Sequence, residues 1–358
     1  MSVSIMDVAR RAGVGKSTVS RVLTDDVAVR PGTRLKVEEA MGAMGYRPNA
    51  LARGLVHGHT HTLGLIVPDL LNPFFGLLAR GVETAALARG YNVLISDSAA
   101  NAARQHACLD LLAERRVDGV LIAPFGGEDD AFAAIRAAGL RGVLVNSTAG
   151  DPALSSVGAD NVQGGYLAAA HLLARGHRRI GFLGDAHTVE SCRERLVGYR
   201  RAHREAAVAD DPAVVVEDLA GMEAVHAAVR RLLALPRPPT AIFTVNDQFA
   251  IACLQALSFL GRRVPEDIAL VGYDDIPVAA WLSVPLTTMA QPKEEQGRLA
   301  ADLLIDHIET ADTPVQRIIL QPRLVVRRSS DASRPPDAAD INDADIQVDV
   351  HTYLEQTA

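Results

Sequence analysis

MDVARRAGVGKSTVSRVL, the stretch from Met6 to Leu23, predicts two short helices joined by a tight turn. The first helix is expected over residues 5–12, because Ser4 can cap its N-terminus and Asp7, three residues later, completes a capping box. Gly13 then ends this helix, since glycine reaches positive φ without a steric penalty.

The second helix is expected over residues 16–23, with apolar and polar side chains on opposite sides. The inward side chains are Val19, Val22 and Leu23. The outward side chains are Lys16, Ser17, Ser20 and Arg21. This arrangement of helix, glycine turn and second helix is typical of a helix-turn-helix, whose second helix enters the major groove of DNA.

Gly15-Lys16-Ser17 also matches the end of a phosphate-binding loop, which requires G-x-x-x-x-G-K-[ST] after a strand. The first glycine of that motif would fall at Arg10, and the residues before it have a helical pattern. We therefore interpret the stretch as a DNA-binding motif.

The 358 residues are enough for two or three domains with ample core, since 48% of them are hydrophobic. No apolar run approaches the roughly 18 residues of a membrane-spanning helix. The start, MSVSIMDVAR, lacks the apolar segment of a signal peptide, so we expect a cytoplasmic protein without a membrane partner. Three widely spaced cysteines fit a reducing compartment and offer no metal-binding spacing.

The net charge of −7 is unevenly distributed along the chain. Residues 1–60 contain nine lysines and arginines against five acidic residues, a net charge of +4, and the remainder contains 27 against 38, a net charge of −11. A basic head on an acidic body is expected of a protein that binds nucleic acid at one end.

A third helix is expected over residues 31–44, with Pro31 in its first turn and Gly45 at its end, although Arg30 is a poor N-cap. From Asn49 the chain could add two helical turns, which are too short to be stable alone. Alternate histidines follow in residues 57–61, but an exposed linker lacks the groups that orient metal ligands, so no metal site is expected.

From Thr62 onwards short apolar runs alternate with amphipathic helices, which predicts parallel sheets covered on both faces. Strands are expected at residues 63–67, 92–96, 119–123, 143–146, 179–183, 213–216, 241–245, 268–273, 287–290 and 318–326. Helices are expected at residues 73–89, 101–114, 129–138, 162–175, 191–205, 222–234, 248–260 and 294–308. About ten strands exceed one comfortable sheet, so we expect two lobes divided near residue 159.

Ligands of open parallel sheets bind beyond the carboxyl ends of the strands. The residues expected there are Pro68, Asp69, Asn72, Pro73, Phe74, Phe75, Ala123, Pro124, Phe125, Asn146, Ser147, Gly184, Asp185, Asn246, Asp247, Asp274 and Asp275. Each alone could simply cap the next helix. Together these amides, carboxylates and aromatic rings suit a small polyhydroxylated or heterocyclic ligand.

Over residues 4–328 the chain resembles the lactose-repressor/galactose-repressor (LacI/GalR) family of bacterial transcription regulators. The segments that carry the resemblance are DVARRAGVGKSTVSRVL (7–23), GYRPNALAR (45–53), HLLARGHRRI (171–180), RLVGY (195–199), Asn246-Asp247, VPEDIALVGYDD (264–275) and PLTT (285–288). The resemblance implies an α/β fold with an N-terminal three-helix helix-turn-helix domain and hinge helix, then a two-lobed, periplasmic-binding-protein-like core of parallel sheets. It implies a homodimer that binds a palindromic operator in double-stranded DNA, with a small-molecule effector between the lobes.

The expected domains follow from this resemblance. They are a DNA-binding domain (1–47), a hinge helix and linker (48–61), an effector-binding and dimerisation core (62–328) and an acidic tail (329–358). The core would comprise an N-lobe (about 62–158 and 291–317) and a C-lobe (about 159–290 and 318–328). The tail contains seven acidic residues and one arginine, so it is expected to be disordered or weakly helical.

The resemblance also implies roles for individual residues. Lys16, Ser17 and Arg21 would face base edges, with Arg21 the expected reader of guanine. Backbone phosphates would be contacted by Thr18, Ser20, Thr33, Arg34 and Asn49. Leu55, in the hinge segment that also contains Ala52 and Arg53, would insert into the minor groove at the centre of the operator.

Seven positions match the family's effector contacts. They are Phe74, Asn146, Arg193, Asn246, Asp274, Trp281 and Gln291. Arg193 would donate to hydroxyls or a carboxylate, Asp274 would accept from hydroxyls, and Trp281 would stack on a ring.

The chain departs from the family pattern at a few positions. Gly15 replaces the usual serine N-cap of the recognition helix, and Arg30 replaces a small polar cap. Gly54 and Val56 stand where a serine and a small or basic residue are usual. The tail has no leucine heptad, so a dimer is expected rather than a tetramer.

The leading hypothesis is a transcription regulator, most often a repressor in this family, with a sugar or sugar acid as effector. The alternative within the same scaffold is a purine or other metabolite as corepressor. An enzyme is not expected, because the sequence lacks G-x-S-x-G, H-E-x-x-H and an early G-x-G-x-x-G, and no cofactor is expected. A solute-binding protein is disfavoured by the basic head.

Overall fold

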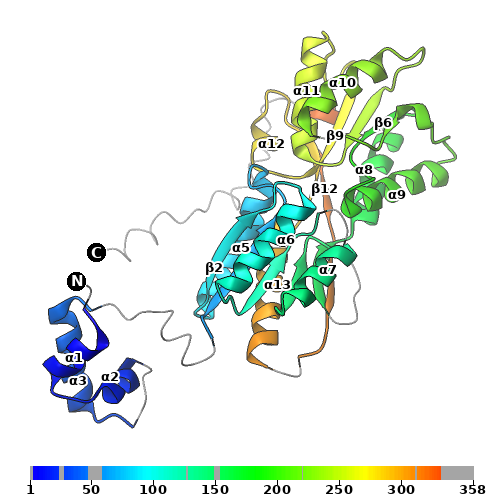
Figure 1. The fold of residues 1–358 in the computed structure, drawn as a ribbon. Helices are drawn as coiled ribbons and strands as arrows, with labels where there is room; N and C mark the ends of the chain where they lie inside the picture. Colours follow the sequence, from blue (N-terminus) through cyan, green and yellow to red (C-terminus); the bar gives the residue numbers. More distant parts are fainter. Residues whose placement is uncertain are drawn as a thin grey trace. The chain divides into compact units, whose positions relative to one another are not determined.

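The structure, a computed structural model, describes residues 3–23, 28–46, 59–125, 128–148, 154–219, 221–310 and 313–331. The chain forms two compact units, the head and the core, divided between His61 and Thr62 (Figure 1). No helix among these residues is both long enough and apolar enough to cross a membrane.

The described residues of the head form three helices with the predicted bounds, α1 (Ile5–Ala12), α2 (Lys16–Leu23) and α3 (Pro31–Met44). The capping box is present, since the Ser4 hydroxyl accepts from Asp7 N and the Asp7 carboxylate accepts from Ser4 N. Gly13 lies in the left-handed region at φ 68° and ends α1. Arg30 makes no side-chain cap at α3, as its sequence predicts. Six side chains form a separate small core: Val8, Ala9, Val19, Val22, Val37 and Ala40.

The first lobe of the core contains a six-stranded parallel sheet in the order β11-β5-β4-β3-β1-β2. Its strands are β1 (Thr62–Val67), β2 (Asn92–Asp97), β3 (Gly119–Ile122), β4 (Gly142–Val145), β5 (Ser155–Ala159) and β11 (Arg317–Leu320). Its helices are α5 (Pro73–Ala88), α6 (Ala102–Glu114), α7 (Glu128–Ala137) and α13 (Lys293–Glu309).

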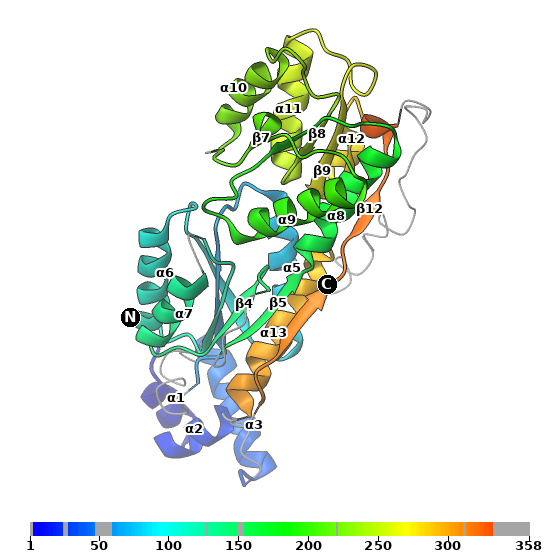
Figure 2. The ribbon, with the colours of Figure 1, turned by 90° about the vertical axis from the view of Figure 1, so that its right-hand side faces the viewer.

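Alternation along the strands places helices on both faces of this sheet (Figure 2). Leu65 and Val67 belong to the hydrophobic cluster under α5 and α13. Ile66, between them, belongs to the cluster under α6 and α7. The continuous apolar run of β1 therefore reflects burial on both sides.

The second lobe contains six strands in the order β12-β10-β9-β8-β6-β7, of which only β12 is antiparallel to its neighbour. Its strands are β6 (Ile180–Leu183), β7 (Val215–Val216), β8 (Ala241–Thr244), β9 (Ala269–Asp274), β10 (Thr287–Ala290) and β12 (Arg323–Val325). Its helices are α8 (Asn161–Ala174), α9 (Glu190–Glu205), α10 (Met222–Leu233), α11 (Asp247–Phe259) and the short α12 (Val278–Trp281), with 3₁₀ turns at Pro212–Val214 and Arg328–Ser330.

The chain passes between the lobes three times, from β5 into α8, from β10 into α13, and from β11 into β12. The single strand predicted over residues 318–326 is wrong, because Gln321 and Pro322 separate β11 in one sheet from β12 in the other. Proline has no N–H to donate to a sheet, which favours the break.

Strand β5 was missed by the sequence analysis, because SSVGA does not have an apolar pattern. Its residues are nevertheless all buried. The Ser155 hydroxyl accepts from Gln316 N at 2.9 Å and contacts His307 Nε2 at 2.9 Å, so the polar side chain is satisfied inside the lobe. The strand predicted at 213–216 is also shorter, since its first half forms a 3₁₀ turn.

Candidate functional site

The outer side of α2 carries the predicted base-reading side chains. Lys16, Ser17 and Arg21 are exposed, and Thr18 and Ser20 are half-buried, while Val19 and Val22 face the core of the head. Thr33 and Arg34, in the first turn of α3, are half-buried. The structure therefore turns one polar and basic helix face outwards, as recognition of DNA requires.

The predicted hinge contacts lie outside the residues that the structure describes. They are Asn49, Ala52, Arg53 and Leu55. Most of the tail, residues 332–358, also lies outside them.

A cavity of about 530 Å³ lies between the two lobes of the core. The first lobe contributes residues after β1, β3 and β4, and the second contributes residues after β6, β8 and β9 together with α9. Thirteen of the predicted strand-end residues line it: Pro68, Asp69, Asn72, Phe74, Phe75, Ala123, Pro124, Phe125, Asn146, Ser147, Asp185, Asn246 and Asp274. The rule that ligands bind beyond the carboxyl ends of parallel strands therefore located this cavity correctly.

Two lining residues hold unusual backbone conformations where their strands end. Asn146 has φ 56° after β4 and Asp274 has φ 114° at the end of β9. Left-handed conformations are uncommon for residues other than glycine, although Asn and Asp adopt them more readily. Such strain is concentrated at functional sites, and here it directs an amide and a carboxylate into the cavity wall.

Asp274 is held from several directions. Gln291 Nε2 donates to Asp274 Oδ1 at 2.8 Å, and Gln296 Nε2 donates to Gln291 Oε1 at 3.3 Å. The Asn72 side chain, from the first lobe, also hydrogen-bonds Asp274. Burial raises the pKa of Asp274 to about 6, against the lowering effects of nearby Arg195, the Gln291 hydrogen bond and Lys293.

Asp247 does not line the cavity, although its place after a strand predicts that it would. Its carboxylate accepts from Thr288 Oγ1 at 2.6 Å and from Ile276 N at 2.9 Å. Burial raises its pKa well above the ordinary value, and the charge of Asp274 adds to this. Asp247 therefore links the start of α11 to β10 and to the loop after β9. Pro73, Gly184 and Asp275 are likewise absent from the described lining.

Arg195 is the one cation among the described lining residues, and the residue is only 4% exposed. Its Nε donates to Asn161 Oδ1 at 2.9 Å, and its Nη1 donates to Val245 O. The ring of Tyr273 lies against the guanidinium, with the Arg195 Cζ 3.7 Å from the ring centroid. These contacts fix a buried charge at the wall of the cavity.

Two glycines allow α9 to bring Arg195 to this position. A Cβ atom at Gly165 of α8 would collide with Arg195 O, and one at Gly198 of α9 would collide with Val162 O. The two helices therefore cross with their backbones in contact, which only glycine permits. This close crossing places the first turns of α9 over the cavity.

The prediction of Arg193 as a cavity residue is not supported by its position. Its side chain is 52% exposed and forms an ion pair with Glu190 at 2.7 Å. Cys192, Arg195, Leu196 and Tyr199 are among the buried residues of α9, at the helical spacing i, i+3, i+4 and i+7. That spacing was available in the sequence and would have selected Arg195.

Trp281 also lies outside the cavity lining, with 71% of its surface exposed. Ala279, two residues earlier on the short helix α12, is fully buried. Residues two apart point to nearly opposite sides of a helix, so the burial of Ala279 directs Trp281 to solvent. The other five predicted effector contacts, Phe74, Asn146, Asn246, Asp274 and Gln291, do line the cavity.

Glu194 and Asn161 were not predicted from the sequence. Thr148 Oγ1, from the first lobe, donates to Glu194 Oε1 at 2.8 Å. Asn161 Nδ2 donates to Glu194 Oε2 at 2.9 Å. Glu194 thus joins the two lobes, a role that depends on contacts far apart in sequence.

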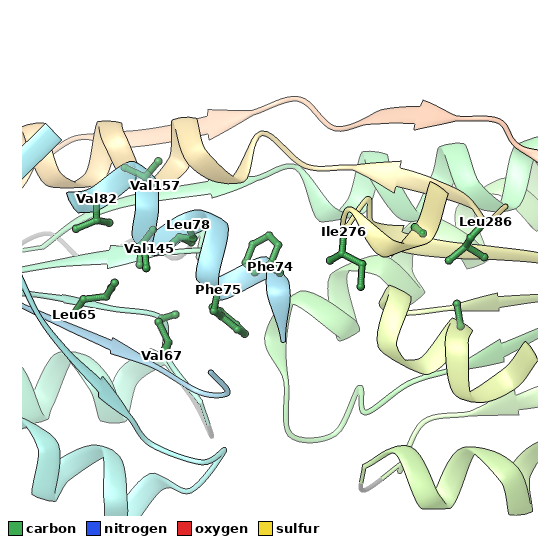
Figure 3. Close-up of a cluster of buried hydrophobic side chains, with 14 of the residues drawn as sticks. Leu65, Val67, Phe74, Phe75, Leu78, Val82, Val145, Val157, Ile276 and Leu286 are labelled. Atoms are coloured by element: carbon green, nitrogen blue, oxygen red, sulfur yellow. The ribbon is translucent and has the colours of Figure 1, made fainter. Parts of the chain in front are cut away.

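The apolar part of the cavity includes Phe74 and Phe75 at the start of α5, next to Leu78 and Val82 of the same helix (Figure 3). The ring centroids of Phe74 and Phe75 lie 5.0 Å apart in an edge-to-face arrangement. Asn72 caps this helix by accepting from Phe74 N at 3.0 Å. Rings beside amides and carboxylates provide both stacking and hydrogen bonds for a small ligand.

The described lining offers little for nucleophilic catalysis. Cys192 lines the cavity, but burial raises the pKa of its thiol to about 11, which keeps it protonated and unreactive. Ser147 and Ser191 line it without a histidine among the described lining residues to act as a base. The arrangement is suited to binding.

Comparison with known protein families finds matches to both units. Residues 4–49 match the family described as bacterial regulatory proteins, lacI family. Residues 169–330 match the periplasmic binding protein-like domain.

Among curated relatives, the transcriptional repressor PurR of Photobacterium profundum is 34% identical over 327 residues, which is 91% of this chain and 98% of the relative. The ribose operon repressor of Escherichia coli K12 is 36% identical over 328 residues, which is 91% of this chain and 99% of the relative.

Two solved structures extend these similarities to three dimensions. The lac repressor dimer bound to operator and the anti-inducer ONPF has a TM-score of 0.82 and 27% identity, covering 92% of this chain and 99% of that one. The regulator CelR in complex with cellobiose has a TM-score of 0.69 and 34% identity, covering 92% of this chain and 100% of that one.

Proposed function

Because the chain belongs to the lacI family of bacterial regulatory proteins, we propose that it is a transcription repressor whose binding to an operator is controlled by a small molecule. One observation carries this proposal. The same chain contains a helix-turn-helix with an exposed basic face and a cavity between two lobes that is lined by polar groups from both. In this proposal, the head determines which DNA sequence is bound, and the ligand in the cavity determines whether the protein binds it.

In this proposal, Lys16, Ser17 and Arg21 read bases in the major groove, and Thr18, Ser20, Thr33, Arg34 and Asn49 contact phosphates. The exposure of the first three on α2 supports the assignment. The lac repressor structure, a dimer bound to operator, supports a homodimer on a palindromic site.

We assign the hinge to the segment that contains Ala52, Arg53 and Leu55. A helix of this length that contains Gly54 is expected to be unstable alone, so in this proposal DNA and the second subunit order it while Leu55 inserts into the minor groove. The effector would then act by changing the angle between the lobes and so the distance between the two hinges. Such coupling is reciprocal, so operator DNA must change effector affinity by the same factor.

We propose a sugar-type effector held by Phe74, Asn146, Arg195, Asn246, Asp274 and Gln291. The carboxylate, amides and guanidinium of these residues are groups that bind hydroxyls. The cellobiose in the CelR structure supports this class. A purine or other metabolite as corepressor is the alternative, supported by the rings of Phe74 and Phe75.

We further propose that the protein acts by binding rather than by catalysis, in the cytoplasm where chromosomal DNA is accessible. The protonated thiol of Cys192 and the described lining without a histidine support this proposal.

A two-stage experiment tests the proposed function. Selection of the full chain against random duplex DNA should enrich a palindromic sequence, and fluorescence anisotropy on that sequence should then be measured with a panel of sugars, sugar acids and purines. At least one compound should change operator affinity severalfold or more. Enrichment of no sequence, or an operator affinity that no compound changes, would count against the proposal.

A further inference from the structure

We propose that the effector carries no anionic group: the cavity selects an uncharged polyhydroxylated ring, as in a free sugar or a nucleoside, over sugar acids, sugar phosphates and nucleotides. This inference rests on the proposed function and adds the charge of the ligand at the same site. It narrows the class that the sequence alone indicates, which includes sugar acids.

The first observation is the charge of the cavity wall. Five carboxylates and one guanidinium line it: Asp69, Asp185, Glu190, Glu194, Asp274 and Arg195. Behind the wall, Arg193 pairs with Glu190, and Lys293 Nζ donates to the backbone oxygens of Asp274 and Asp275. Even with both of these cations counted, acidic groups outnumber basic ones, so an anion would meet like charge in a partly enclosed site.

The second observation is that Arg195 is already committed to protein partners. Two of its three nitrogen atoms donate to Asn161 and Val245, and one face is covered by Tyr273. Its positive charge also acts on buried Asp274, whose pKa it lowers. Recognition of a carboxylate or phosphate by arginine normally uses two parallel N–H donors with no competing partner. Arg195 is therefore poorly placed to neutralise an incoming anion.

The third observation is the kind of hydrogen bond that the wall can make. Ionised carboxylates accept hydrogen bonds and cannot donate them. Asp274, held by Gln291, and Asp185, held by Thr188 N at 3.0 Å, present acceptors in fixed positions. Hydroxyl groups of a sugar or nucleoside can donate to such acceptors, whereas the oxygens of a carboxylate or phosphate can only repel them at neutral pH.

Matched pairs of compounds test this inference by isothermal titration of the full chain at pH 7.5 and constant ionic strength. The pairs are ribose and ribonate, glucose and gluconate, glucose and glucose 6-phosphate, and adenosine and adenosine monophosphate. We expect at least one neutral member to bind and its anionic counterpart to bind at least ~100-fold more weakly. The sugar and nucleoside pairs distinguish the two sources of the neutral ring.

An anionic compound that binds as tightly as its neutral counterpart would overturn the inference and leave a ligand-controlled regulator intact. A panel in which no member of any pair binds would instead overturn the proposed effector class, and this inference with it.

Asp185→Asn provides a charge test at the wall, because asparagine retains an acceptor oxygen for Thr188 N. In this variant, the ratio of the dissociation constants of the anionic and neutral members of the binding pair should fall at least ~5-fold. Asp110→Asn, on the exposed side of α6 and outside the cavity lining, is the matched control and should leave this ratio unchanged. An equal ratio in wild type and in Asp185→Asn would contradict an electrostatic origin of the selectivity.

Discussion

Asn161 Oδ1 accepts a 2.9 Å hydrogen bond from Arg195 Nε and so fixes the one guanidinium among the described cavity residues. The Nδ2 of the same amide donates to Glu194, whose other oxygen accepts from Thr148 of the first lobe. The cavity wall is therefore linked to the opposite lobe through a continuous set of side-chain hydrogen bonds. A ligand that changes the hydrogen bonds of Arg195 or Glu194 therefore acts directly on a contact that joins the lobes.

The position of Arg195 leads to a paired substitution. Arg195→Lys should weaken effector binding at least tenfold and lower the free energy of unfolding by about 2–4 kcal/mol, because a buried charge loses its fixed partners. Arg193→Lys, two residues away and half exposed, should change both by little. Titration calorimetry and denaturant unfolding measure the two effects. Equal losses in both variants would mean that the buried position of Arg195 is not what matters.

Asp274 makes the stability of the free protein depend on pH. Its pKa is raised from 3.8 to about 6, so the folded protein holds this proton more tightly than the unfolded chain. The destabilising contribution is therefore absent below about pH 4 and fully present above about pH 6. Asparagine at this position cannot ionise. The free energy of unfolding of Asp274→Asn should therefore rise by about 3 kcal/mol relative to that of wild type as the pH increases from 4 to 7.

Denaturant unfolding of wild type and Asp274→Asn at several pH values measures this difference directly. Using the difference removes other titrations, such as that of His171, whose pKa burial lowers to about 4. A stability difference that stays constant with pH would show that Asp274 is not the titrating group.

Two glycine substitutions should have opposite effects on stability, because only Gly198 lies at the crossing of α8 and α9. Gly198→Ala should destabilise the core by about 2–3 kcal/mol, because the added methyl group meets the Val162 backbone. Gly76→Ala, in α5, has open space around the new Cβ and should stabilise by up to about 1 kcal/mol through helix propensity. Thermal unfolding distinguishes the two signs, and destabilisation by both would refute the role of backbone contact.

The proposed hinge predicts separable losses. Leu55→Ala should weaken operator binding strongly, because the inserted side chain is lost, and should leave effector affinity without DNA nearly unchanged. Anisotropy on the selected operator and calorimetry on the free protein provide the two measurements. An operator affinity equal to that of wild type would eliminate the hinge account.

The proposed base contact of Arg21 predicts a change in specificity. Arg21→Ala should relax discrimination at one base pair of each half-site by about 1–3 kcal/mol, as loss of a bidentate guanine contact does. Thr33→Ala, at a proposed phosphate contact, should instead weaken binding to all sequences about equally. If Arg21→Ala instead lowers the affinity for every DNA sequence to the same extent, Arg21 contacts only the DNA backbone.

The sequence predicted those features that depend on neighbouring residues. Ser4, Asp7 and Gly13 determine the ends of α1 through local hydrogen bonds and backbone freedom, so these ends were predicted to the residue. The strand-end residues of the cavity were found because the topology of parallel sheets brings those ends together.

The structure differs from the sequence predictions for two separate reasons, of which the first is the effect of distant contacts. Ser155 and Gly158 form a strand only because neighbouring strands and His307 satisfy them. The choice between Arg193 and Arg195 depended on the rotational phase of α9, which helical periodicity contains and a match to family phrases does not.

The three passages between the lobes also determine the order in which the chain can fold during synthesis. Helix α13 and strand β11 belong to the first lobe, yet they follow almost all of the second. Until they leave the ribosome, the face of β3, β4 and β5 that α13 covers, including Val145 and Val157, stays open to solvent. The lobe that begins first is thus completed late, and its apolar face lacks the cover of α13 while the second lobe is being synthesised, an interval in which aggregation competes with folding.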